Sequence, residues 1–147
     1  MKTLIFALFL VSTATAGSAG PAGAEDSRQL VKLPAPAQAA LVEEMQGNLL
    51  ALNEVLSLIA AGKTKEAGDV AEARLGMSAM GKHRAKPFDA RPGPHMPPAM
   101  HGIGMDGHKA VSEFAAAAKT GDRDKALALL PNLTGACVAC HFSYRTR

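Results

Sequence analysis

The fold is decided by residues 36–62, which read PAQAALVEEMQGNLLALNEVLSLIAAG. Apolar residues recur in this stretch at spacings of three and four, which places them on one face of a helix. The members of that face are Leu41, Met45, Leu49, Leu52, Leu56 and Ile59. Pro36 suits the first turn of a helix, because the amide that proline lacks would be unpaired there anyway, and Gly62 suits the end. We therefore expect a long amphipathic helix between these two residues.

Two more helices follow with the same periodicity. The second is expected from Thr64, which can act as its N-cap, to Gly81. Residues 83–98 hold five prolines, which exclude a helix and indicate a long loop. A third helix is expected to begin with the last two of these prolines, Pro97 and Pro98, and to end at Gly121 as a left-handed cap.

The last helical region is expected to begin after Asp122, whose carboxylate suits an N-cap. Pro131 lies inside this region and removes a backbone donor, so we expect a short helix, a break and a final helix from about Pro131. No segment has the alternation of a strand. The sequence therefore predicts an all-α fold, an antiparallel up-down-up-down four-helix bundle.

The composition is that of an ordinary globular domain. Of 147 residues, 48% are hydrophobic and 20% are charged, which excludes a disordered or collagen-like chain and suits one domain. Aromatic residues make up 4%, so a surface that stacks nucleic-acid bases is not expected. The net charge of +3 comes from basic residues interleaved with acidic ones, and we expect no nucleic-acid partner.

The first 24 residues have the three parts of a secretory signal peptide. Lys2 precedes an apolar run from Leu4 to Val11, and small residues follow up to Ala24. We expect cleavage near Ala24, export to the periplasm or an equivalent compartment, and one mature domain over residues 25–147. The apolar run is far short of the roughly 20 residues that cross a bilayer, so we expect no membrane span.

Residues 137–141 read CVACH, which is typical of covalent haem c attachment. On a helix, Cys140 lies about 60° and His141 about 40° from Cys137, so two thiols and one imidazole point to the same side. Each thiol can add to one vinyl group of a porphyrin, and the imidazole can ligate the iron. The sequence therefore predicts one haem c, with its iron, near the C-terminus.

The same two cysteines allow other interpretations. They could form a redox-active pair, as in thioredoxin-like enzymes, or a structural disulfide in an oxidising compartment. A thioredoxin-like pair belongs where a strand meets a helix, and no strand is expected here. No further cysteine or clustered histidine pair completes a zinc site. Haem attachment is therefore favoured.

The mature chain as a whole resembles a class II c-type cytochrome, the family of cytochrome c-prime and its low-spin relatives. The resemblance rests on an exported four-helix bundle whose haem motif, CVACHFSYR over residues 137–145, lies near the C-terminus. It implies a one-electron carrier rather than an enzyme, with unidentified redox proteins as partners. It also implies that Arg145, four residues after the haem histidine, lies near the porphyrin. The alternative for Arg145 is a solvated terminal charge.

A methionine of the first helix binds iron in the low-spin branch of this family, and EEMQGN at residues 43–48 resembles that version, with Met45 as the ligand. In such a bundle the start of the first helix is level with the end of the fourth. Met45, roughly 13 Å into the first helix, and His141, roughly 9 Å from the chain end, therefore face one another. The end of the second helix and the start of the third lie at the same height in such a bundle. Met77, Met80 and Met100 are therefore alternative iron ligands. In the family's other branch the position is open, which would make the chain a five-coordinate protein that binds nitric oxide or carbon monoxide.

Two further interpretations concern the loop and the first helix. Thioethers and imidazoles around the loop form a set that suits copper, although they follow no fixed spacing. The members of this set are His95, Met96, Met100, His101, Met105 and His108. Leu50 and Leu58 lie on the face of the first helix opposite the core, and relatives with this fold often pair through that helix, so a homodimer is an alternative to a monomer.

Overall fold

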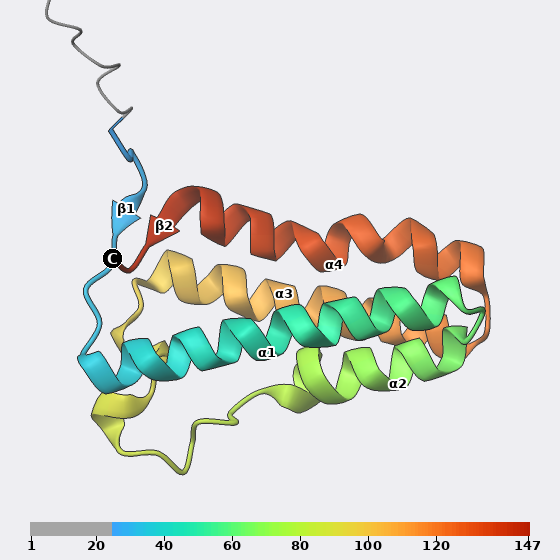
Figure 1. Cartoon of the computed structure of the whole chain (residues 1–147), viewed down its shortest axis with the longest axis horizontal. Coiled ribbons are helices and arrows are strands. Elements are labelled where there is room, and N and C mark those ends of the chain that lie inside the picture. Colours follow the sequence, from blue (N-terminus) through green and yellow to red (C-terminus); the bar gives the residue numbers. More distant parts are fainter. Residues whose placement is uncertain (1–24) are drawn as a thin grey trace, which may run out of the picture.

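The computed structural model describes residues 25–147, and the predicted signal peptide over residues 1–24 lies outside this part of the chain. The described residues form four α-helices, as the sequence predicts (Figure 1). Their bounds are Ala35–Ala60 for α1, Thr64–Leu75 for α2, Pro98–Lys119 for α3 and Arg123–Ser143 for α4. The expectation of an all-α fold is confirmed.

Helices that follow one another in the chain pack on one another: α1 on α2, α2 on α3, and α3 on α4. Figure 1 shows that each helix runs back along the one before it, so the start of α1 and the end of α4 lie at the same end of the molecule. We call this the motif end, because α4 carries the CVACH run there. Within residues 25–147, α1 and α4 are not one of the closely packed helix pairs.

The main core lies at the opposite end, next to the short connections between helices. Small alanines let neighbouring helices approach closely there, and Phe114 of α3, which has no exposed surface, belongs to a core cluster with residues from all four helices. The core residues are Val55, Ile59, Ala67, Ala71, Val111, Phe114, Ala115, Ala118, Ala126 and Leu133. Among the described residues of α4, only Ala126 and Leu133 are buried. The part of α4 that carries the haem motif therefore adds no buried side chain to this core.

The apolar face expected on α1 is buried only near its ends. Leu41 and Ile59 are buried, but Met45, Leu49 and Leu56 are 37%, 69% and 44% exposed, which contradicts a uniformly core-facing stripe. The packed face of α1 is displaced from the expected one, because small residues as well as leucines face the neighbouring helices. Its buried residues are Ala37, Ala40, Leu41, Ala51, Val55 and Ile59.

The two leucines expected opposite the core of α1 differ from each other. Leu50 is 60% exposed, as expected. Leu58 packs against the core, so its assignment to the outer face is wrong.

The end of α2 differs from the sequence expectation. It ends at Leu75 rather than Gly81, and only a short turn, η1 (Met77–Ala79), follows. A side chain at Gly76 would collide with the Glu72 carboxylate, which accepts hydrogen bonds from Ser78 N (3.0 Å) and Ser112 Oγ (2.6 Å). This polar contact with α3 turns the chain out of the helix.

Other helix ends agree better with the sequence. Asp122 accepts a hydrogen bond from Lys125 N at 2.9 Å, and Gly121 has a positive φ of 84°, so both expected caps are confirmed. Thr64 is the first residue of α2, and its side chain makes no capping bond, so it is not the expected N-cap. Pro98 begins α3 and Pro97 is its N-cap, which agrees with the expected start. Residues 83–97 hold only two short 3-10 turns, η2 (Phe88–Ala90) and η3 (Gly93–His95), which confirms the loop.

The expected break at Pro131 is wrong, because α4 is one continuous helix. Proline costs a helix the hydrogen bond to the carbonyl four residues earlier. That carbonyl belongs to Leu127, and both Leu127 and Pro131 are exposed, so water can satisfy the freed acceptor.

Two short strands were not expected. Strand β1 (Gln29–Leu30) pairs in parallel with β2 (Tyr144–Arg145), which directly follows α4. Val31, which is 4% exposed, extends the pairing by donating its N–H to the carbonyl of Arg145 at 2.8 Å. Each strand has 2 residues, too few for an alternating pattern to show in the sequence.

Replacing Phe114 by alanine is expected to lower the free energy of unfolding by about 3–5 kcal/mol, because it leaves a cavity where all four helices meet. Urea denaturation followed by circular dichroism measures this change. Phe88→Ala is the matched control, since Phe88 is 59% exposed and makes an edge contact with His95, and it should cost at most about 1 kcal/mol. Equal losses in the two variants would contradict the placement of the core.

The Glu72 contact should make stability depend on pH. Hydrogen bonds from Ser112, and then from Ser78, hold the pKa of Glu72 below its ordinary value. As pH falls, Glu72 is therefore protonated in the unfolded chain before it is protonated in the folded one. The stabilisation by the charged carboxylate is complete above the pKa of Glu72 in the unfolded chain, and it is lost as pH falls through the pKa in the folded protein. Glu72→Gln should be less stable near neutral pH and lose less stability on acidification than wild type. Parallel acid dependences of the two proteins in urea denaturation would contradict this.

Candidate haem-attachment site

The three residues of the motif lie in the last two turns of α4. Cys137 and His141 are exposed, and Cys140 is half-buried. Both thiols are free. Because the helix is continuous through Ser143, the three side chains share one side of it, as the spacing predicts. The structure therefore brings the two thiols and the imidazole together at the surface.

The position of the two cysteines bears on the redox interpretation. A thioredoxin-like pair belongs where a strand meets a helix, whereas Cys137 and Cys140 both lie inside α4. Burial, and then the neighbouring Cys137 thiol, raises the pKa of the Cys140 thiol above its ordinary value. The described residues therefore lack the strand-to-helix junction that the thioredoxin-like interpretation requires.

Metal binding by ordinary side-chain clusters finds no support in the part of the chain that the structure describes. No group of three or more His, Cys, Asp or Glu side chains is placed to hold a metal ion there. His141 is thus not part of a preformed zinc site among these residues.

The surface around the motif is apolar and largely uncovered. Val138 is 55% exposed and Phe142 is 81% exposed. By length and composition α4 could cross a membrane, and only 11% of its most apolar stretch is buried. One such helix is weak evidence for a membrane span, but the low buried share shows that this stretch of α4 is mostly uncovered within the described chain.

Arg145 is neither fully solvated nor free. Its side chain is 30% exposed, and its buried Nε lies 3.5 Å from Oδ2 of Asp26, an ion pair too long for a hydrogen bond. Its Nη1 donates to the carbonyl of Arg147 at 3.3 Å. Arg145 therefore lies at the motif end, held by a residue from the other end of the chain.

The four methionines considered as the second iron ligand differ in exposure. Met100 is 6% exposed in the first turn of α3, so its thioether is occupied in packing. Met45 on α1 is 37% exposed, as is Met80, and Met77 is 40% exposed. Met100 is therefore far more buried than the other three. The exposures of Met45, Met77 and Met80 give no reason to prefer one of them as the ligand.

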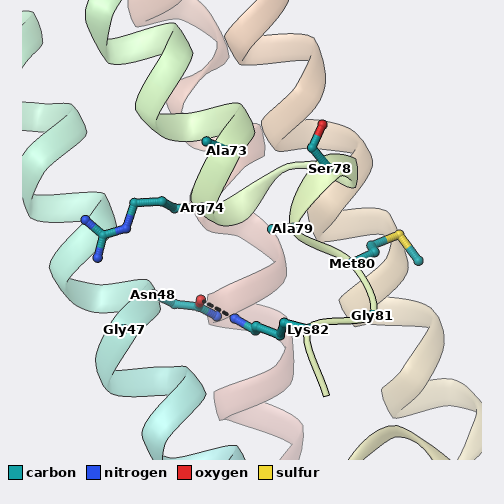
Figure 2. A pocket seen from close by; sticks show the side chains of 9 residues that line it. All are labelled: Gly47, Asn48, Ala73, Arg74, Ser78, Ala79, Met80, Gly81 and Lys82. Atoms are coloured by element: carbon teal, nitrogen blue, oxygen red, sulfur yellow. Dashed lines mark hydrogen bonds between the residues drawn. The ribbon is translucent and has the colours of Figure 1, made fainter. Parts of the chain in front are cut away.

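Met80 borders a pocket of about 420 Å³ between α1, the end of α2 and residues 78–82. Figure 2 shows Asn48 and Lys82 meeting across this pocket, where Lys82 Nζ donates to Asn48 Oδ1 at 3.4 Å, while the Met80 thioether points away from them. Lys82 is also paired with Glu44, 3.1 Å away, next to Met45 in the sequence. This pocket was not expected, because no sequence motif links these residues.

The histidines and methionines suggested for copper are spread over several contacts. His108 Nδ1 donates to the carbonyl of Leu75 at 2.7 Å, and His95 packs edge-on against Phe88. Met96 and His101 line a common pocket of about 440 Å³. Two ligands in an open pocket do not make a defined site, so copper binding stays a prediction from sequence alone.

Sequence reasoning missed Asp26 and Arg28, which contact the motif end although they lie far from it in the sequence. Arg28 Nη1 lies 3.4 Å from the carbonyl oxygen of His141, 113 positions away. No spacing rule connects residues so far apart. Comparison with known proteins adds nothing here, because no protein-family model, curated protein or solved structure matches the chain.

Proposed function

We propose that the chain is an exported one-electron carrier that holds one haem c through thioether bonds from Cys137 and Cys140. His141 would bind the iron on one side. The observation that carries the proposal is this donor set, two free thiols and an imidazole on one exposed side of the last turns of α4. The resemblance to class II c-type cytochromes supports the same assignment.

The surroundings of the motif fit a large planar apolar group. Beyond Leu133, no described residue of α4 is buried, and the apolar side chains there face solvent. On α1 the apolar face around Leu49 is also uncovered. A porphyrin against these surfaces would remove apolar area from water, which is the main favourable contribution in folding. We propose that it completes an antiparallel up-down-up-down bundle.

Met45 is the proposed second ligand, with redox proteins as partners and no catalytic role. A methionine and a histidine would hold the iron from both sides, so the chain would leave no open position for a substrate or a gas. The haem supplies an iron that takes up and gives back one electron. The same two side chains would stay bound to the iron in its oxidised and its reduced state. This favours electron transfer over reaction with a substrate.

The test is to produce the full chain together with a cytochrome maturation system and to purify the exported product. Covalent haem should stay with the chain on a denaturing gel and through acid–acetone extraction. Haem that is lost under both conditions would contradict the proposal. A fraction that remains with membranes after washing in high salt would instead support α4 as a membrane helix.

A further inference from the structure

The segment over residues 26–31 lies against the end of α4. Figure 1 shows β1 beside β2, the strand that directly follows α4. The pairing places Gln29 opposite Tyr144 and Leu30 opposite Arg145. The N-terminal segment is therefore attached to the backbone that leaves α4.

Charged side chains add a second attachment. Asp26 accepts two hydrogen bonds from the Arg28 guanidinium, Oδ1 from Nε at 2.9 Å and Oδ2 from Nη2 at 2.7 Å, and one from the Arg28 backbone N–H to Oδ1 at 3.1 Å. These bonds fix the guanidinium of Arg28 with its remaining nitrogen, Nη1, 3.4 Å from the carbonyl oxygen of His141. The same hydrogen bonds lower the pKa of Asp26 to about 2, so the carboxylate is charged under ordinary conditions.

The position of this contact explains its effect. Carbonyls in the last turn of an α-helix have no partner within the helix, and they carry the negative end of the helix dipole. A cationic donor at that place satisfies the carbonyl and stabilises the turn. Arg28 does this for the turn of α4 that contains His141.

We propose that Arg28 is a positioning residue of the haem site. Held by Asp26, it fixes the last turn of α4 and so sets the orientation of the His141 imidazole toward iron. The inference rests on the proposed function, because it assigns a role to Arg28 only through the haem histidine.

The experiment compares Arg28→Gln with Arg74→Gln in the full-length product. Arg74 is a matched control, because it also forms an exposed ion pair at 2.7 Å, with Glu54, and the exposures of the two pairs are similar at 40%/45% and 42%/42%. Its partner, however, is on α1, and neither residue contacts α4 in the hydrogen bonds and ion pairs of the described chain. The two variants therefore remove equal charge and a similar contact.

Two measurements are made on each protein. Hydrogen exchange followed by mass spectrometry reports the opening of residues 138–147, and electron paramagnetic resonance of the ferric form reports the orientation of the axial imidazole. Arg28→Gln should speed exchange in this segment about fivefold, the factor expected for one lost hydrogen bond, and should shift the g-values. Arg28→Lys, which can still donate to the carbonyl, should give smaller changes. Arg74→Gln should match wild type in both measurements.

The outcomes separate this inference from the proposed function. Wild-type protein without covalent haem would contradict the proposed function and, with it, the role of Arg28. Retained haem with Arg28→Gln indistinguishable from Arg74→Gln would contradict the inference alone. Faster exchange with unchanged g-values would also overturn it, because Arg28 would then stabilise the helix end without orienting the imidazole.

Discussion

Alanine at both Cys137 and Cys140 is expected to give a colourless protein, with complete loss of covalent haem. The structure gives a reason to expect a second effect, on folding. Beyond Leu133, the described part of α4 has no buried side chain, so without a porphyrin its apolar surface stays in water. The double variant should therefore unfold at lower urea concentration and over a broader range than wild type.

Absorbance of the purified protein and urea denaturation check both effects. Val138→Ala is the control, because it changes an exposed residue between the two cysteines and keeps both thiols. It should retain haem and stability. A colourless double variant as stable and cooperative as wild type would show that the haem has no structural role.

Met45→Ala is expected to convert the iron from low spin to high spin and to let the ferrous protein bind carbon monoxide quickly. The reduction potential should also fall, since a thioether ligand favours ferrous iron. Wild-type protein should bind carbon monoxide slowly or not at all. Absorption spectra, including the sulfur-to-iron charge-transfer band of the ferric form, and carbon monoxide mixing measure these changes.

Met80→Ala is the matched control for this substitution, because Met80 is as exposed as Met45, at 37%, and lies beside the pocket formed with α1. If Met80→Ala or Met77→Ala changes the spectrum and Met45→Ala does not, only the identity of the ligand is wrong. Wild-type protein that is already high-spin would instead support a five-coordinate gas-binding protein and contradict the proposed electron carrier.

The sequence predicts the helices well where local signals decide them. Asp122 and Gly121 mark helix boundaries through their own backbone and side-chain chemistry, and both act in the structure as expected. The end of α2 was missed because it depends on Ser112, which is 40 positions from Glu72. A contact of this kind leaves no trace in local periodicity. Pro131 was misjudged because the cost of proline depends on whether the freed carbonyl can reach water.

In the candidate site too, residues placed by local spacing could be predicted and residues placed by tertiary contacts could not. Cys137, Cys140 and His141 share one helix, so their spacing alone places them together. The proposed ligand Met45 lies on a different helix, and its exposure is like that of the alternatives Met77 and Met80. Arg28 could not be found at all from sequence, because its contact with His141 depends on how the two ends of the chain meet.

The separation of the main core from the motif end bears on biogenesis. The ten residues that pack together at the far end come from all four helices, so a hydrophobic nucleus can assemble before any cofactor is attached. Cys137 and His141 stay exposed in that arrangement. Under the proposed function, a newly exported chain would acquire its tertiary scaffold while Cys137 and His141 remain accessible to an attachment enzyme, and thioether formation would be a late step of maturation.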